Sequence, residues 1–437
     1  MNDQSHPHLT FRTLHARDGD AESEQHTTAW IQAVSRGFHD GRIEDDGLRF
    51  WRHHAAVDGA VATGVWDDRP TPGRPDDAGP ELPVATFVSF DKDLSVGGGS
   101  RVPVHMITDV TVAPTHRRNG LLRRMMGDDL AAAAARGLPL AALTVSEGGI
   151  YGRFGFGPAT RHRTVEVDVR SGFAFRRPVA DAGRVVLVEP AHLLTTAQEV
   201  FARFHSATRG SIGRPSVYDA FTDASMAPDL TGPNKALRAA VHLDADGRPD
   251  GYALHKHSYA DDRGKLEVFE LLAVDDTAYL ALWEHLAAMD LVDVVTWNRS
   301  PVDDPLAWAL VSPRSVKVTG VRDGLWVRVL DVVAALQGRP WAADGSVVLA
   351  VSDPLGHAEG RFRVEVASGT ATASALDGPS SPDDVALAVD TLGSLYLGDV
   401  DVEVLAAAGR VTGPSDAVGT FAAMARCGTA PYNPTGF

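Results

Sequence analysis

Four arginines lie close together in the segment THRRNGLLRRMM, residues 115–126, although the chain of 437 residues carries a net charge of −16. The segment follows a strand-like run and opens a helix-like run. At such a turn, backbone N–H groups point outward, the helix dipole adds about half a positive charge, and arginine donates bidentate hydrogen bonds to phosphate. A turn with merely solvated arginines is the alternative, but the flanking strand and helix favour a site for a phosphate-bearing ligand.

A second segment, GGIYGRFGFG at residues 148–157, surrounds Tyr151 with glycines. The glycines exclude a long regular helix and allow the backbone to lie close to a ligand. Because they do not run as G-x-G-x-x-G from a strand into a long helix, they do not indicate a dinucleotide site. Taken alone, Tyr151 is more often a core aromatic residue whose hydroxyl is hydrogen-bonded.

Composition and charge limit the partners and the compartment. The 57 acidic residues against 41 basic ones argue against nucleic acid as the main partner and favour cationic ligands. Cys427 is the single cysteine, which excludes an intrachain disulfide and a Cys-based zinc site, and we expect it to be a small buried residue. Because the sequence shows no signal-peptide pattern and no apolar run near the roughly 20 residues that span a bilayer, we expect a cytoplasmic protein without a membrane partner.

No metal site is predicted. His255 and His257 lie two residues apart, but no carboxylate stands at a recognisable spacing from them. We expect both histidines to be exposed on a strand.

Strands and helices alternate around the two segments. Apolar patterns predict strands at residues 9–14, 59–66, 82–90, 101–114 and 138–145. Residues 30–38 show helical spacing, and the helix that follows the arginine turn presents one apolar face and ends at Gly137.

A composition break at residues 170–183 separates a second unit with the same order of elements. Its strands are predicted at residues 184–190, 250–259 and 265–274, and its helices at 191–208 and 275–289. Where the first unit has its arginine turn, the second has VDDT at residues 274–277, so it is predicted to lack an anion site. From about residue 316, short strands indicate a third unit, with helices around residues 382–393 and 413–424.

Residues 110–126, VTVAPTHRRNGLLRRMM, resemble motif A of the GCN5-related N-acetyltransferases (GNAT), whose Arg/Gln-x-x-Gly-x-Gly/Ala turn holds the pyrophosphate of acetyl-CoA. Leu122 departs from the Gly or Ala of the last motif position. This departure, together with SEGGIYGRFGFGPAT, DGLWVRV, LGSLYLG and a terminal phenylalanine, is similar to the Eis (enhanced intracellular survival) aminoglycoside acetyltransferases. The matches follow in order from about Phe38 to Phe437, so the resemblance covers nearly the whole chain.

The resemblance implies an α+β fold in three parts and a homohexamer. A catalytic GNAT domain is expected at residues 1–172, a second GNAT-like domain without the pyrophosphate turn at 173–318, and a domain similar to sterol carrier protein 2 at 319–437. The implied reaction is direct transfer of acetyl from acetyl-CoA to a primary amine of an aminoglycoside or similar polyamine. It takes place in a ternary complex, without a covalent enzyme intermediate and without a metal.

The resemblance also assigns roles to individual residues. It implies that Tyr151 is the general acid for the departing CoA thiolate, and a phenol of pKa about 10 can donate to a thiolate of roughly 8 to 9. It implies that the carboxylate of Phe437 is the base for the amine proton. Contacts with acetyl-CoA are implied for Val110, Thr111, Val112, Arg117, Arg118, Asn119, Gly120, Leu121, Leu122, Arg123, Ser146 and Glu147, and contacts with the acceptor for Asp40, Trp51, Asp109 and Gly436. We expect Arg124 to be solvated.

Two other functions stay open at this point. A protein or peptide lysine acetyltransferase would turn over a peptide lysine faster than kanamycin-like amines. A non-enzymatic protein that binds CoA and a lipid would bind CoA without amine-dependent release of its thiol.

Overall fold

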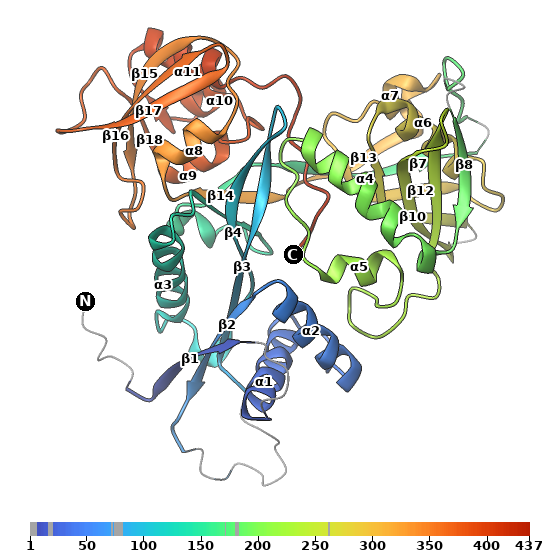
Figure 1. The fold of residues 1–437 in the computed structure, drawn as a ribbon, viewed down its shortest axis with the longest axis horizontal. Helices are drawn as coiled ribbons and strands as arrows, with labels where there is room; N and C mark the ends of the chain where they lie inside the picture. The colour runs from blue at the N-terminus through green and yellow to red at the C-terminus, as the bar shows by residue number, and fades with distance from the viewer. Residues whose placement is uncertain are drawn as a thin grey trace.

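The computed structural model describes residues 7–15, 21–70, 73, 82–170, 172–179, 183–260 and 263–437. These residues form two seven-stranded sheets and one five-stranded sheet, each with helices packed against it. In Figure 1 the three parts lie around the C-terminus, with the first mostly blue to cyan, the second green to yellow and the third orange to red. The combination confirms the predicted α+β class. Within the described ranges, no helix has both the length and the apolar character that crossing a bilayer requires.

The first sheet is built around a parallel pair of strands, β4 (Ser100–Val112) and β5 (Leu140–Thr144). Its order is β1-β2-β3-β4-β5-β14-β6. The other strands are β1 (Leu9–His15), β2 (Val61–Asp67), β3 (Ala85–Gly97), β14 (Leu325–Val329) and β6 (Gly157–Pro158). The helices of this part are α1 (Ala21–Gly37), α2 (Asp45–Val57), α3 (Leu121–Ala135) and the short 3-10 helices η1 (Pro114–His116) and η2 (Tyr151–Phe154).

Alternate side chains of the central strands enter two different cores. On β4, Met106 belongs to a core shared with the C-terminal part, whereas Ile107 packs with α3. On β5, Ala142 and Leu143 divide in the same way. Because successive side chains of a strand point to opposite faces, the sheet is a middle layer between α3 and the C-terminal part.

The second sheet has the order β13-β7-β12-β11-β10-β9-β8. Its strands are β7 (Arg161–Asp168), β8 (Gly183–Val188), β9 (Arg238–Asp244), β10 (Pro249–Ala260), β11 (Arg263–Ala273), β12 (Val294–Pro301) and β13 (Val316–Asp323). Its helices are α4 (Leu194–Ala207), α5 (Val217–Thr222), α6 (Asp276–Ala287) and α7 (Leu306–Ala309), with the 3-10 helices η3 (Pro190–His192) and η4 (Pro313–Ser315). As in the first sheet, a parallel pair, β11 and β12, lies near the middle.

Two strands exchange places between these sheets. β7 follows the glycine segment of the first part but lies between β12 and β13, and β14 follows the second part but lies between β5 and β6. Each strand is therefore the last but one of its sheet, β14 in the sheet of the first part and β7 in the sheet of the second part. The boundaries predicted at residues 172 and 318 fall between these two strands in the sequence. Because β7 and β14 each pair with strands on the other side of a boundary, the division into 1–172, 173–318 and 319–437 stays a proposal.

The third part is a five-stranded sheet of order β17-β16-β15-β18-β19 with four helices. The strands are β15 (Gly345–Ser352), β16 (Gly360–Ala367), β17 (Thr370–Leu376), β18 (Val385–Ala388) and β19 (Val411–Thr412), and the helices are α8 (Val332–Gly338), α9 (Val389–Leu395), α10 (Val402–Ala407) and α11 (Ser415–Ala425). The helix expected around residues 382–393 begins only at Val389, because the preceding four residues pair with β15 as a parallel strand.

A buried histidine fastens α3 to the first sheet. His105 on β4 lies between two carboxylates, with Nδ1 2.6 Å from Asp91 on β3 and Nε2 2.7 Å from Asp129 on α3. Burial alone would lower the pKa of His105, but the hydrogen bonds to Asp129 and Asp91 outweigh burial and raise the pKa above its usual value. An imidazolium that donates from both ring nitrogens therefore ties together the two strands and the helix that carry the arginine turn.

We expect this link to weaken as pH rises. Because the folded-state pKa of His105 is raised above the unfolded value of about 6.5, the imidazolium stabilises the fold fully below about pH 6.5 and loses its contribution as pH rises through the folded-state pKa. The free energy of urea unfolding of His105→Gln should fall below that of the wild type by on the order of 1–3 kcal/mol near pH 6, and by less near pH 9. The exposed His257→Gln is the control, and a difference that grows with pH would contradict the assignment.

Candidate active site

The parallel strands β4 and β5 separate at one end. Their pairing ends at Ile107 and Leu143, although β4 continues to Val112. Opposite β3, the register shifts between Thr86 and Val88, so that β4 carries one extra residue, and Asp109 at this bulge has a φ of 52°. Bulges turn side chains and backbone groups away from the regular ladder. The strand edge at Val110, Thr111 and Val112 is thereby open toward the gap between β4 and β5.

The arginine turn joins this strand to α3. Arg117 ends η1, and Arg118 and Gly120 both adopt left-handed backbone conformations with φ of 68° and 74°. Gly120 is the N-cap of α3 and supplies no side-chain hydrogen bond, so the first N–H groups of α3, at Leu121, Leu122 and Arg123, have no capping side chain. An uncapped helix N-terminus beside exposed arginines fits a pyrophosphate group.

Two leucines and a fourth arginine of this turn are less exposed. Leu121 is buried in the core between α3 and the sheet, and Leu122 packs against that core from its edge. The side chain of Arg124 is 40% exposed, and its guanidinium lies 3.8 Å from the ring centre of Phe11 on β1. Arg117, Arg118 and Arg123 are exposed, and Asn119 is half-buried.

Tyr151 begins η2, a short distance along the chain from β5. Its ring is half-buried against the α3 core and lies 6.4 Å from the ring of Phe156. Burial raises the pKa of the Tyr151 phenol, and the negative charge of Glu147 raises it further. A phenol with a raised pKa stays protonated at neutral pH and can act only as a proton donor. Ser146 and Glu147 are exposed between β5 and η2.

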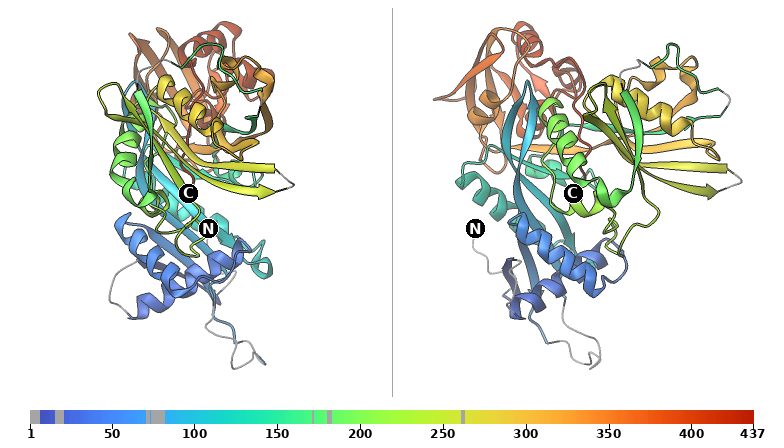
Figure 2. Two further views of the ribbon diagram at one scale, coloured as in Figure 1. Left: turned by 90° about the vertical axis from the view of Figure 1, so that its right-hand side faces the viewer. Right: turned by 45° about the vertical axis from the view of Figure 1, so that its right-hand side comes forward.

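The last residues of the chain lie between the first and second parts, as Figures 1 and 2 show. The hydroxyl of Thr144, at the end of β5, donates to the backbone oxygen of Phe437 at 2.5 Å, and the Phe437 ring lies edge-on to Phe90 at 6.5 Å. Residues 431–435 leading to it are buried. The structure therefore brings the chain terminus to the end of β5, where the parallel strands separate.

Tyr218 on α5 holds the penultimate residue from the other side. Its hydroxyl accepts from the N–H of Gly436 at 2.6 Å and donates to its carbonyl at 3.0 Å. The Arg214 guanidinium lies 4.9 Å from the Tyr218 ring and forms a buried ion pair with Glu270. The guanidinium of Arg299 packs directly against Gly436, so a side chain at this position would require Arg299 to move. The sequence analysis did not identify Thr144, Tyr218 or Arg299. No local motif marks them, because each contacts the C-terminal residues only in the folded structure.

Two of the residues expected to contact the acceptor meet in the structure. Trp51 on α2 is close enough to the carboxylate of Asp109 to influence its pKa. Burial raises the pKa of Asp109 to about 6, although the polar N–H of Trp51 acts in the opposite direction. Asp40 lies on the exposed turn after α1, where its N–H donates to the carbonyl of Ser35 at 2.9 Å.

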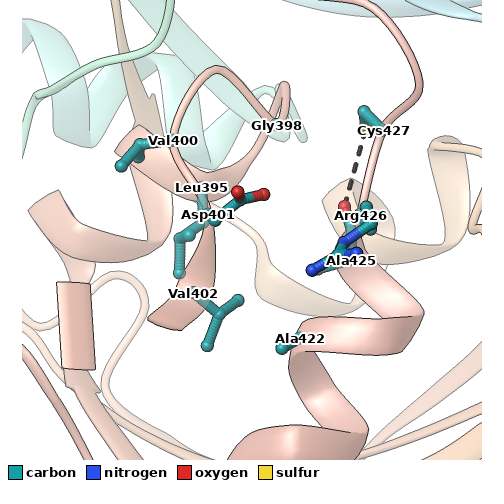
Figure 3. A pocket seen from close by; sticks show the side chains of 9 residues that line it. All are labelled: Leu395, Gly398, Val400, Asp401, Val402, Ala422, Ala425, Arg426 and Cys427. Carbon is teal, nitrogen blue, oxygen red and sulfur yellow. Dashed lines mark hydrogen bonds between the residues drawn. The ribbon is translucent and has the colours of Figure 1, made fainter. Parts of the chain in front are cut away.

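Other candidate groups lie away from this region. The expectation that His255 is exposed is wrong: it is 3% exposed, and burial and the charge of His285 lower its pKa to about 4. Cys427 is half-buried rather than buried, and Figure 3 shows it beside a small pocket between the end of α9 and the end of α11. Among the residues that line this pocket, none is a predicted catalytic or cofactor-binding residue. Within the described ranges, no three His, Cys, Asp or Glu side chains group as metal ligands would.

Comparisons with known proteins agree with this geometry. Residues 23–159 and 211–329 each match a model described as an acetyltransferase (GNAT) domain, and residues 332–434 match a sterol carrier protein domain. A Streptomyces griseus protein named as an uncharacterised N-acetyltransferase is 36% identical over 365 residues, which cover 81% of this chain and 86% of the relative. The N-acetyltransferase Eis of Mycobacterium tuberculosis is 35% identical over 374 residues, which cover 83% of this chain and 85% of the relative.

Solved structures show the same arrangement along the whole chain. Eis1 from Mycobacterium abscessus superimposes with a TM-score of 0.77 at 29% identity, covering 98% of this chain and 100% of that one. A GCN5-related N-acetyltransferase from Anabaena variabilis shares the fold with a TM-score of 0.78 at 18% identity and the same coverage. The predicted fold of two GNAT domains followed by a sterol carrier protein domain is confirmed.

We expect the tail to be released when the Tyr218 hydroxyl is removed. Because a hydrogen bond contributes about 1 kcal/mol, Tyr218→Phe should raise the rate at which a carboxypeptidase removes the last residues by at least about fivefold. Mass spectrometry of timed digests measures this rate. Tyr396→Phe, which loses a buried hydroxyl bonded to Ala335 in the C-terminal part, is the matched control. Equal digestion of Tyr218→Phe and the wild type would show that Tyr218 does not hold the tail.

Proposed function

Because this chain belongs to the Eis-type N-acetyltransferases of the GNAT superfamily, we propose that it transfers the acetyl group of acetyl-CoA to a primary amine of an aminoglycoside or a similar polyamine. The observation that supports this reaction best is the position of the Phe437 terminus at the end of β5, in the same region as the arginine turn and the Tyr151 turn. Family membership also favours an enzyme over a non-enzymatic binder.

The GNAT domains imply an acyl-CoA substrate, and we propose acetyl-CoA. Arg117, Arg118 and the uncapped N–H groups of α3 would hold its pyrophosphate, because they combine exposed positive charge with free donors. The open edge of β4 at residues 110–112 would bind the pantetheine through backbone groups. Ser146 and Glu147, which are exposed after β5, would border the same gap.

In the proposed reaction the amine attacks the thioester directly. The amine nitrogen forms a bond to the carbonyl carbon, and the bond from that carbon to sulfur breaks. The carboxylate of Phe437 accepts the proton that the nitrogen loses, and the Tyr151 hydroxyl donates a proton to the departing thiolate. Exchange with solvent then restores both groups. No group of the protein forms a covalent intermediate.

The acceptor is proposed to be a cationic small molecule, which suits the net charge of −16. Asp109 supplies a carboxylate near Trp51, and it would bind an ammonium group that is not being acetylated. Asp40, on the exposed turn after α1, would add negative charge nearer the solvent. We further propose that the chain assembles as a homohexamer, as the resemblance implies.

The acid role of Tyr151 is tested with a thiol-release assay over kanamycin-like aminoglycosides, polyamines and a lysine peptide. We expect Tyr151→Phe to lower kcat on the amines by about 100-fold while changing the Kd of acetyl-CoA less than about twofold, since general acids contribute roughly 10²- to 10⁴-fold. Tyr259→Phe, at a position that is 68% exposed, is the control. Undiminished kcat in Tyr151→Phe would contradict the role, and faster turnover of the peptide than of the amines would identify a lysine acetyltransferase instead.

The role of Asp109 is tested by the pH dependence of acceptor binding. Because its pKa is about 6, the carboxylate loses its charge as pH falls through about 6, and the KM of a cationic acceptor should rise there. Asp109→Asn should raise the KM by about tenfold at pH 7.5 and remove this dependence, since a hydrogen bond to a charged group contributes about 1.5–3 kcal/mol. An unchanged KM profile in Asp109→Asn would exclude the carboxylate from acceptor binding.

A further inference from the structure

A fully buried ion pair connects the exchanged strand β14 to the C-terminal part. Arg328 on β14 donates to Asp353, which follows β15, at 2.6 Å, and both side chains are 0% exposed. The carboxylate also accepts from the N–H groups of Leu355 and Ala358 at 3.0 and 2.8 Å. A buried ion pair is often no more stabilising than a pair of well-packed apolar residues. Its presence here therefore needs a reason other than stability.

The guanidinium of Arg328 forms the floor of the turn that carries Tyr151. Its Nη1 and Nε have no hydrogen-bond partner among the described residues, and a Cβ at Gly155 would overlap Nη1. Gly155, with a φ of 83°, ends η2, and its N–H donates to Gly152 at 2.9 Å. The next residue, Phe156, donates to the carbonyl of Tyr151 at 3.3 Å. The backbone of Tyr151 is thus fixed to a glycine that rests on Arg328.

A second contact seats the same turn on the C-terminal part. A Cβ at Gly157 would overlap the carbonyl of Asp390 and the hydroxyl of Ser394 on α9, and a Cβ at Gly393 would overlap the carbonyl of Val327 on β14. Close backbone contacts therefore join three segments of the chain, which are the glycine segment, DGLWVRV and LGSLYLG. There is no room for a side chain at Gly155, Gly157 or Gly393, so the Tyr151 turn packs directly on Arg328 and α9.

From this packing we propose that Arg328, held by Asp353, is a positioning residue for the Tyr151 hydroxyl. The proposal rests on the proposed function, in which Tyr151 protonates the thiolate. A proton donor must be held within about 0.5 Å of its productive position, and a displacement of about 1 Å can lower a rate by roughly 100-fold. The C-terminal part thereby acts on the reaction by two separate routes, through its terminal carboxylate and through the floor under the acid.

The test removes both charges of the pair, so that no unpaired charge stays buried. We expect Arg328→Met combined with Asp353→Asn to lower kcat by about 10- to 100-fold, while the Kd of acetyl-CoA changes less than about twofold. The matched control is Arg361→Met with Asp384→Asn, a bidentate pair at 2.7 and 2.9 Å in the same part of the chain, which should leave kcat unchanged. Urea unfolding of both double variants separates a positioning effect from a loss of folded protein.

The same two substitutions are then introduced into the Tyr151→Phe variant. If Arg328 acts through the tyrosine hydroxyl, the two substitutions should lower the residual kcat of this variant less than about twofold. An equal loss in both backgrounds, or no loss in either, would overturn the proposal and leave the acid role intact. Undiminished kcat in Tyr151→Phe alone would instead contradict the acid role of Tyr151 on which the proposal rests. If the double variant does not fold, Arg328→Lys is measured against the same expectations. This substitution keeps a cation beside Asp353 and removes the Nη1 atom that contacts Gly155.

Discussion

The docking of the last two residues at the end of β5 is the contact on which the rest of the site depends. Thr144 of the first part holds Phe437, and Tyr218 of the second holds Gly436. The peptide itself arrives from the third part through buried residues 431–435. A carboxylate that belongs to the end of the chain reaches this point only when all three parts are folded around it. The exchange of β7 and β14 supports that arrangement, because each sheet contains a strand that connects it to the other region.

The two GNAT domains differ at one helix N-terminus, and this difference bears on where the proposed pyrophosphate site lies. In the first domain the N-cap of α3 is Gly120, which leaves the N–H groups without a side-chain acceptor. In the second, the N-cap of α6 is Asp275, whose carboxylate accepts from Ala278 at 2.9 Å. A carboxylate at this position occupies the N–H of Ala278 and repels a phosphate. Under the proposed function, the pyrophosphate would therefore bind at α3 and not at α6.

Features set by neighbouring residues could be predicted from the sequence, and features set by distant ones could not. Local composition predicts the arginine turn, the strands before it and a different turn in the second unit. The structure agrees with all three predictions. The burial of His255 and the contact of Arg124 with Phe11 could not be predicted from the sequence, because both depend on residues of other elements. The strand exchange and the Arg328–Asp353 pair join residues that have no local signature. Residue roles in the site rest on the family resemblance rather than on spacing.

Replacement of the terminal carboxylate of Phe437 by a carboxamide, through semisynthesis of the C-terminal segment, tests most directly whether the chain end is the catalytic base. The change removes the negative charge and keeps the size and the hydrogen bond from Thr144. We predict that kcat falls by about 100-fold while the Kd of acetyl-CoA and the free energy of unfolding stay within experimental error of the unmodified protein. Undiminished turnover by the carboxamide form would contradict the central claim, because another group would then have to accept the proton.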